Sequence, residues 1–176
     1  SLVHEGMLLF EPGSVASSRI TWPASTSFAA LRASRTGIGH ESRAELASAD
    51  RVDVIMAFVK WHGLRLFEER LRAMRATGIP LRIITTTYMG ATERQALDRL
   101  VEEFGAQVKV QYDAQRTRLH AKAWRFRRNT GFDTAYVGSS NLSRAAMLDG
   151  VEWNVRLSAV STPPLLHKFL ATFDSY

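Results

Sequence analysis

The chain of 176 residues is long enough to bury a core of its own, and its hydrophobic content of 45% excludes a disordered protein. No apolar run approaches the roughly 18 residues that a membrane span needs, and the lack of cysteine excludes disulfides and thiolate metal sites. The net charge of +6 favours a polyanionic partner. The lack of cysteine also fits a reducing compartment, so we expect a cytoplasmic location.

Two parts are expected along the chain. Residues 1–40 form an N-terminal extension packed on the domain, and residues 41–176 form the domain itself. Within the extension, LLFEP favours a short strand and PASTSFAALRAS, from Pro23, a short helix, while frequent Ser, Gly and Thr favour loops. Because the sequence starts at Ser1 without Met and ends at Tyr176 in a helical pattern, we expect it to be a module of a longer protein.

Strands and helices alternate from Glu41 onward. Helices are predicted over 41–50, 64–77 and 92–104, and apolar strands over 52–59, 81–87 and 108–113. Such apolar runs are typical of strands covered on both faces. Thr92 is the N-cap candidate of its helix, with Gln95 at the reciprocal capping position. The alternation predicts right-handed crossovers and a largely parallel sheet.

The pattern changes after residue 113. Strands over 121–126 and 134–140 are joined by RRNTGFD, whose Asn129 and Gly131 suit a turn, so a hairpin is predicted. A short helix over 142–148, a strand over 153–157 and a helix from Pro163 follow. The chain is therefore predicted to be an α/β protein with a mixed, mostly parallel β-sheet flanked by helices on both faces.

The segments HAK and GSSN carry the chemistry. Residues two apart on a strand point to the same face, so His120 and Lys122 are expected to project together. Their neighbours are expected to face apolar packing: Leu119, Ala121 and Ala123. An inward histidine and lysine are costly to bury unless they meet an anion. Ser139 and Asn141 can donate hydrogen bonds to phosphate oxygens. Together these residues are typical of a site that handles phosphodiesters.

HAK, GSSN and the downstream Glu152 resemble the phospholipase D superfamily, whose signature is H-x-K, then an Asp, then G-S-x-N. The resemblance implies a phospholipase-D-like fold over Arg51 to Leu157 and a reaction that needs no metal or cofactor. In that reaction one histidine attacks phosphorus, and a second histidine protonates the leaving oxygen and then activates water. It assigns five catalytic residues here: His120, Lys122, Ser139, Asn141 and Glu152. Glu152 matches a position found in the nuclease branch.

The sequence departs from the family pattern in two ways. The family Asp lies five residues after the Lys, where this chain has Arg127, a candidate substrate contact; Asp133 is better interpreted as a turn residue. Glu152 is then expected to orient the imidazole. Only one HxK occurs although the reaction needs two, so we expect a homodimer with one active site on its two-fold axis. Alternatively, another part of a parent chain supplies the second motif.

Further substrate contacts are expected near the motif. Five candidates follow the predicted parallel strands: Lys60, Trp61, Thr86, Thr87 and Tyr88. The aromatic ones can stack on bases or pack in the core. Arg118 can guide phosphate or lie at an exposed strand end. It belongs to a basic run from Arg116 to Arg128 that contains no acid, which favours a phosphate partner over a merely solvated hairpin.

The first hypothesis is a metal-independent phosphodiesterase acting on nucleic acid, with DNA favoured. The segments FVKWHG, TTTYMGAT and LDGVEWNVRLS also resemble the phospholipase-D-like domain at the N-terminus of some bacterial superfamily-II helicases and related restriction or defence proteins, which implies a helicase core as partner. The alternative is a binding module with weak or no catalysis, which Arg127 supports. Lipid hydrolysis and a membrane partner are less supported, because no amphipathic helix has a broad exposed apolar face.

Overall fold

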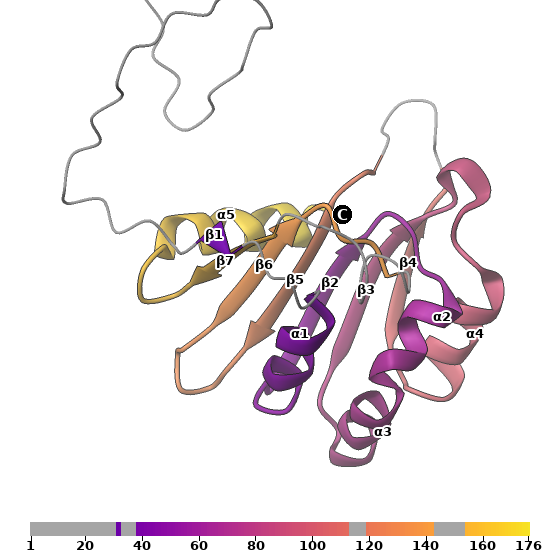
Figure 1. The fold of residues 1–176 in the computed structure, drawn as a ribbon, viewed down its shortest axis with the longest axis horizontal. Coiled ribbons are helices and arrows are strands. Elements are labelled where there is room, and N and C mark those ends of the chain that lie inside the picture. The colour runs from indigo at the N-terminus through magenta and orange to yellow at the C-terminus, as the bar shows by residue number, and fades with distance from the viewer. Residues whose placement is uncertain (1–30, 33–37, 113–118, 143–153) are drawn as a thin grey trace, which may run out of the picture.

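The computed structural model describes residues 31–32, 38–112, 119–142 and 154–176. These residues form one sheet with helices on both of its faces, as predicted (Figure 1). Two predicted elements, the strand LLFEP and the helix over 142–148, lie outside the described residues apart from Leu142.

Three parallel strands form one half of the sheet: β2 (Arg51–Met56), β3 (Leu81–Thr86) and β4 (Gln107–Gln111). The first crossover runs through α2 (Trp61–Leu64), η1 (Arg65–Phe67) and α3 (Glu68–Thr77). The second runs through η2 (Tyr88–Gly90) and α4 (Arg94–Glu102). The predicted helix over 64–77 is thus confirmed as α3, but a 3-10 turn separates it from α2. Gly78 ends α3 with a φ of 72°, a conformation that glycine adopts without strain.

The other half of the sheet is antiparallel. It contains β5 (Lys122–Arg127), β6 (Thr134–Gly138), β7 (Asn154–Ser158) and β1 (Leu31–Arg32). The described strands lie in the order β1-β7-β6-β5-β2-β3-β4, and β5 and β6 form the predicted hairpin.

The sheet is mixed, as predicted, but the expectation that it is mostly parallel is wrong. Of the six pairings among the described strands, only β2–β3 and β3–β4 are parallel. The reason lies between β4 and β5, where no long helical crossover fits in the ten residues from 112 to 121. The chain therefore enters β5 at the edge where β4 ends, and β5 runs back along β2 in the opposite direction.

The main core lies between the sheet and the helices in front of it in Figure 1: α1 (Ile38–Leu46) and α2 to α4. Trp124 and Phe126 of β5 point into this core and are 3% and 0% exposed. α5 (Pro163–Asp174) covers the opposite face, where Leu166 packs on β6 and β7 and Phe173 packs on β2 and β3. None of the helices in the described residues is long and apolar enough to cross a membrane.

Two sequence-based expectations about helix ends are wrong. Leu31 and Arg32, placed in the predicted helix from Pro23, instead form β1 and pair with β7. The N-cap of α4 is Glu93 rather than Thr92, and it makes no capping hydrogen bond with its side chain. The Thr92 hydroxyl instead donates to Ala57 O at 3.3 Å, so it holds the start of α4 against the end of β2.

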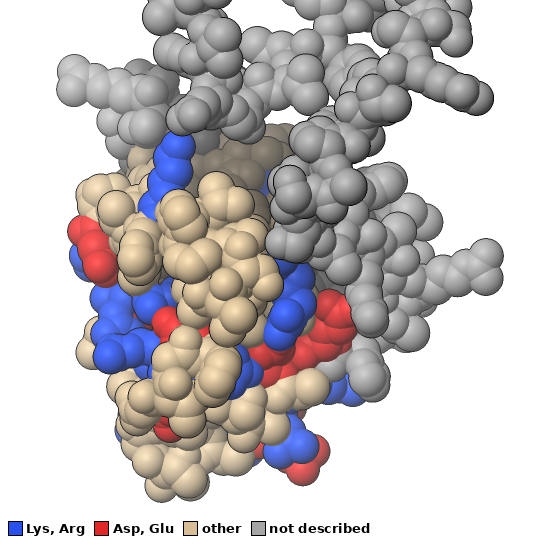
Figure 2. All heavy atoms as spheres, turned by 90° about the vertical axis from the view of Figure 1, so that its left-hand side faces the viewer, with Lys and Arg blue, Asp and Glu red and all other residues tan. Residues whose placement is uncertain are grey.

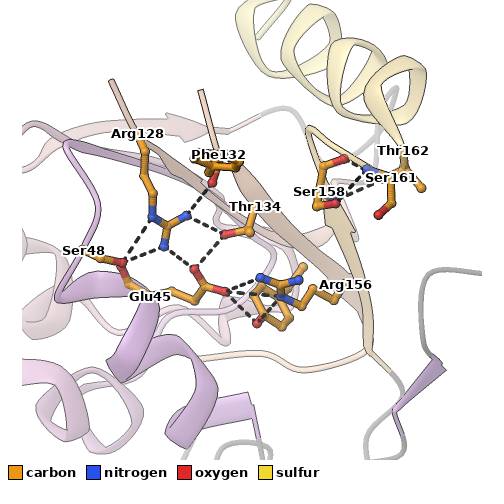
Figure 3. Close-up of polar contacts among 10 residues, drawn as sticks. Glu45, Ser48, Arg128, Phe132, Thr134, Arg156, Ser158, Ser161 and Thr162 are labelled. Carbon is orange, nitrogen blue, oxygen red and sulfur yellow. Dashed lines mark hydrogen bonds and ion pairs between the residues drawn. The ribbon is translucent and has the colours of Figure 1, made fainter. Parts of the chain in front are cut away.

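Glu45 fastens α1 to the antiparallel strands (Figure 3). Its buried carboxylate accepts hydrogen bonds from the Thr134 hydroxyl at 2.8 Å and the Tyr136 hydroxyl at 3.0 Å, and it pairs with Arg128. Burial alone would raise the pKa of Glu45, but the hydrogen bonds from Arg128, Thr134 and Tyr136 outweigh burial and lower it. Burial and the adjacent Glu45 carboxylate raise the pKa of Tyr136, so this phenol stays protonated and donates.

Candidate active site

Both halves of the HAK–GSSN motif lie along one edge of the sheet, the upper edge in Figure 1, where β2 and β6 end. Lys122, the first residue of β5, pairs with Met56 at the end of β2. Gly138, the last residue of β6, pairs with Asn154 at the start of β7. The antiparallel register therefore brings the residues before β5 and the residues after β6 to the same place.

Phe58 connects the two halves of the motif. It lies two residues beyond the end of β2. Its ring meets the His120 ring edge-on, with the ring centroids 5.9 Å apart, and its backbone N–H donates to Asn141 Oδ1 at 3.3 Å. One residue thus holds both the imidazole and the carboxamide in position. Phe58 lies in a predicted strand and opens the segment FVKWHG, but the sequence had given it no role at the site.

His120 is exposed, whereas Lys122 is only 7% exposed. The Lys122 ammonium donates to the backbone carbonyl of His120 at 2.9 Å. A buried ammonium therefore lies directly beneath the backbone that carries the exposed imidazole. The expected apolar packing is confirmed for Leu119 and Ala123, but Ala121 is exposed, because β5 begins only at Lys122 and its alternation does not extend to the residue before it.

The GSSN segment presents a second group of polar side chains. Ser139 is exposed, Asn141 is half-buried, and Ser140 is 2% exposed. Asn154 Nδ2 donates to Ser140 Oγ at 2.9 Å, which ties the segment to the start of β7. Asn154 was not identified from the sequence, although a polar residue opening an apolar strand was an available signal.

The five candidates at or just beyond the ends of β2 and β3 differ in their surroundings. Lys60 and Thr87 are exposed and Tyr88 is half-buried at this edge. Trp61 packs against the core, with the Arg99 guanidinium 4.0 Å from its ring centroid. Thr86 is fully buried, and its hydroxyl donates to Gln111 O at 3.0 Å. Packing therefore accounts for Trp61 and Thr86, while Lys60 remains available to a ligand.

Arg127 does not lie with the motif. It is the last residue of β5, opposite Arg51, and five residue steps along the strand place it about 16 Å from Lys122. The replacement of the family Asp by Arg at this position therefore alters the far end of the strand. Asp133 lies at that end, where it accepts from Arg125 at 2.7 Å and from Arg128 N at 2.8 Å, as a turn residue would.

Carboxylates pair with two arginines of the basic run, so fewer of its cations are available to a ligand than its composition suggested. Arg125 is buried between Asp53 and Asp133, and Arg128 pairs with Glu45. Figure 2 shows basic and acidic side chains intermixed on the side of the molecule that is on the left in Figure 1. Three further candidates lie outside the described residues: Arg116, Arg118 and Glu152. Among the residues that the structure describes, no three side chains gather that could hold a metal ion.

A family model described as cardiolipin synthase, PLD-like domain, matches residues 43–176. The chain belongs to this family of PLD-like (phospholipase-D-like) domains. Membership confirms the resemblance drawn from HAK and GSSN. No curated protein matches the sequence.

Solved structures share the fold of this PLD-like domain at low identity. NucT from Helicobacter pylori is 15% identical, with a TM-score of 0.60 over 78% of this chain and 86% of that one. Nuc from Salmonella typhimurium, described as a phospholipase D family member, is 18% identical, with a TM-score of 0.56 over 77% and 84%. A polyphosphate kinase from Porphyromonas gingivalis is 10% identical, with a TM-score of 0.53 over 81% of this chain but 24% of its own.

Proposed function

We propose that this PLD-like domain is a metal-independent phosphodiesterase that acts on nucleic acid, with DNA as the favoured polymer. The observation that carries the proposal is the contact of Phe58 with both His120 and Asn141. This contact joins the exposed imidazole of His120 and the carboxamide of Asn141 at one edge of the sheet. The buried ammonium of Lys122 lies at the same edge, where it donates to the His120 carbonyl. An imidazole is a nucleophile, and the other two groups can stabilise charge on phosphate oxygens.

In the proposed reaction, an imidazole nitrogen of His120 attacks phosphorus. A P–N bond forms while the P–O bond to the leaving strand breaks, and the leaving oxygen takes a proton from a second histidine. Water then attacks the phosphohistidine, and the second histidine removes the proton of that water as the P–N bond breaks. Lys122 and Asn141 stabilise the non-bridging oxygens, and Glu152 orients an imidazole.

The second histidine is His120 of another copy of the chain. A two-fold axis brings the same residue of both subunits together, so a homodimer provides two imidazoles from one motif. The exposure of His120 supports this arrangement, because a second subunit can reach it. The alternative source is another segment of a parent chain, in which a helicase core is the proposed partner.

Nucleic acid is favoured over other phosphodiesters by the net charge of +6 and by Lys60, an exposed cation beyond β2 at the same edge as His120. The basic run contributes less to this preference than its composition suggested, because carboxylates pair with Arg125 and Arg128.

The test is cleavage of single- and double-stranded DNA and of bis-p-nitrophenyl phosphate in the presence of EDTA. We expect the wild-type protein to cleave and His120→Ala to lose at least about 10³-fold in kcat/KM. His167→Ala is the matched control, since His167 is an exposed histidine of α5 that belongs to neither HAK nor GSSN, and it should retain full activity.

A different outcome would favour the second candidate, a binding module that positions a linked helicase. Salt-dependent DNA binding without cleavage, unchanged in His120→Ala, would sink the enzyme proposal. The location of Arg127 at the far end of β5 weighs against this candidate, because the departure from the family pattern removes no group from the edge that carries His120.

A further inference from the structure

Two large apolar side chains are exposed to solvent at the edge that carries His120. Tyr112 is 76% exposed and Met89 is 74% exposed, the highest values among the large hydrophobic residues that the structure describes. Met89 follows β3 and Tyr112 follows β4, and these strands are parallel neighbours. Both residues therefore lie at the edge where β2 ends and β5 begins.

The backbone of Met89 has a conformation that is unfavourable for a residue with a side chain. Its φ of 59° and ψ of 8° are left-handed, and it is the only non-glycine residue with positive φ in the described part of the chain. Such a conformation persists only where the surroundings enforce it. Here Tyr88 N donates to Thr86 Oγ1 at 3.1 Å and Gly90 N donates to Thr87 O at 2.9 Å.

The same loop is fixed to the end of β4. Thr87 N donates to Gln111 O at 3.2 Å, and Thr86 Oγ1 donates to that same carbonyl at 3.0 Å. Because Tyr112 follows Gln111 directly, the loop that presents Met89 and the residue that presents Tyr112 are joined by hydrogen bonds. The fold thus fixes the backbone positions of both residues at this edge, and the two exposed side chains together are called the apolar ledge.

The position of the ledge fits one kind of ligand. Strands lie about 4.8 Å apart, so the ends of β3 and β4 are about 10 Å and about 14 Å along the edge from the start of β5. A nucleic acid strand with its phosphate at His120 would extend over this distance within a few nucleotides. Its bases can reach apolar side chains only if they are unpaired, because a duplex keeps the base faces inside its stack.

We propose that Met89 and Tyr112 contact unpaired bases next to the phosphate held at His120, so that the substrate is single-stranded nucleic acid. This inference rests on the proposed function and adds its strand preference. Flat bases stack on an aromatic ring, and a thioether packs well against aromatic rings. Of the two aromatic candidates expected from the sequence, Trp61 is occupied by Arg99 and by the core, and Tyr88 is half-buried.

The test measures binding by fluorescence anisotropy in a His120→Ala background, which prevents cleavage. Three probes of equal length are compared: a single strand, its duplex and a single strand of abasic nucleotides. We expect Met89→Ala and Tyr112→Ala each to weaken single-strand binding about tenfold and to leave abasic binding unchanged. Phe132→Ala is the matched control, because Phe132 is 63% exposed in the turn at the opposite edge, and it should change nothing.

Several results would overturn the proposal: unchanged single-strand binding in both variants, an equal loss with the abasic strand, or an equal loss in Phe132→Ala. Tighter binding of the duplex than of the single strand would also overturn it. If the wild-type protein does not cleave but base-dependent binding is intact, the proposed catalysis is refuted, whereas the proposed contact of Met89 and Tyr112 with bases is supported. Because both side chains are exposed, circular dichroism of the variants should match the parent.

Discussion

Asn141 can offer a phosphate only one of its two polar groups. Its Oδ1 accepts the hydrogen bond from Phe58 N. Because a backbone N–H can only donate, the carboxamide must turn its oxygen, and not its NH2 group, towards Phe58. The Nδ2 group is left to donate. An Asp at this position would keep the contact with Phe58 N but would bring a negative charge towards the bound phosphate.

We therefore predict that Asn141→Asp lowers kcat/KM for bis-p-nitrophenyl phosphate by at least about 100-fold and changes the free energy of unfolding by less than about 1 kcal/mol. Steady-state kinetics and urea denaturation measure the two quantities. Asn129→Asp, the same change in the exposed hairpin turn, is the control and should retain activity. An active Asn141→Asp would remove the carboxamide from the proposed mechanism.

At the residue level, the sequence was a good guide to His120 and Asn141 because both belong to short contiguous motifs. It was a poor guide to Arg125 and Arg128. Asp133 pairs with Arg125 from eight residues further along, but Asp53 and Glu45 come from segments more than 70 residues earlier. Only the sheet register and the packing of α1 bring these two carboxylates close to the arginines. A run of like charges in a sequence therefore does not reveal which charges the fold neutralises.

At the level of elements, Glu45 makes the attachment of α1 to β6 and β7 sensitive to pH. Because the pKa of its folded-state carboxyl is lowered below the ordinary value of 4.5, the ionised form stabilises the fold at pH values above 4.5. This contribution is lost as the pH falls through the lowered folded-state pKa. Asp53, held by Arg82 and Arg51 on the other face, acts in the same direction.

We predict that Glu45→Gln lowers the free energy of unfolding by about 2 kcal/mol near pH 7, because the charge-assisted bond to Arg128 is lost. The difference from wild type should shrink as the pH is lowered below 4.5 and through the lowered pKa of Glu45, where the wild-type carboxylate becomes protonated. Urea denaturation at several pH values checks this. Glu69→Gln, at an exposed position of α3, should show no difference at either pH. A constant gap for Glu45→Gln across the range would contradict the prediction.

Elements with strong internal patterns were predictable and those set by distant contacts were not. The apolar runs of β2 and β3 and the turn at Gly131, whose φ is 82°, gave correct strands and a correct hairpin. Leu31 and Arg32 have no strand pattern and become β1 only because β7 offers a free edge. Thr92 has a good capping pattern, but its hydroxyl is used by Ala57 O.

For the whole molecule, the edge that carries His120 is assembled from segments that the sequence separates widely. Phe58 follows β2, His120 precedes β5 and Asn141 follows β6. Because these strands are central in the sheet, their ends are held by neighbours on both sides. The motif predicted which residues carry chemistry, but the reversal of β5 against β2, which joins them, required the three-dimensional structure.

The proposed sharing of one site by two copies gives a quantitative prediction for mixtures. If each site needs His120 from both subunits, activity falls with the square of the wild-type fraction when wild-type and His120→Ala chains exchange freely. An equal mixture, unfolded and refolded together, should then keep about one quarter of the wild-type activity; independent sites would keep about one half. Light scattering on the same samples should give the mass of a dimer. Retention of one half, or a strict monomer that is fully active, would show that one chain completes the site alone and that the second histidine lies elsewhere in it.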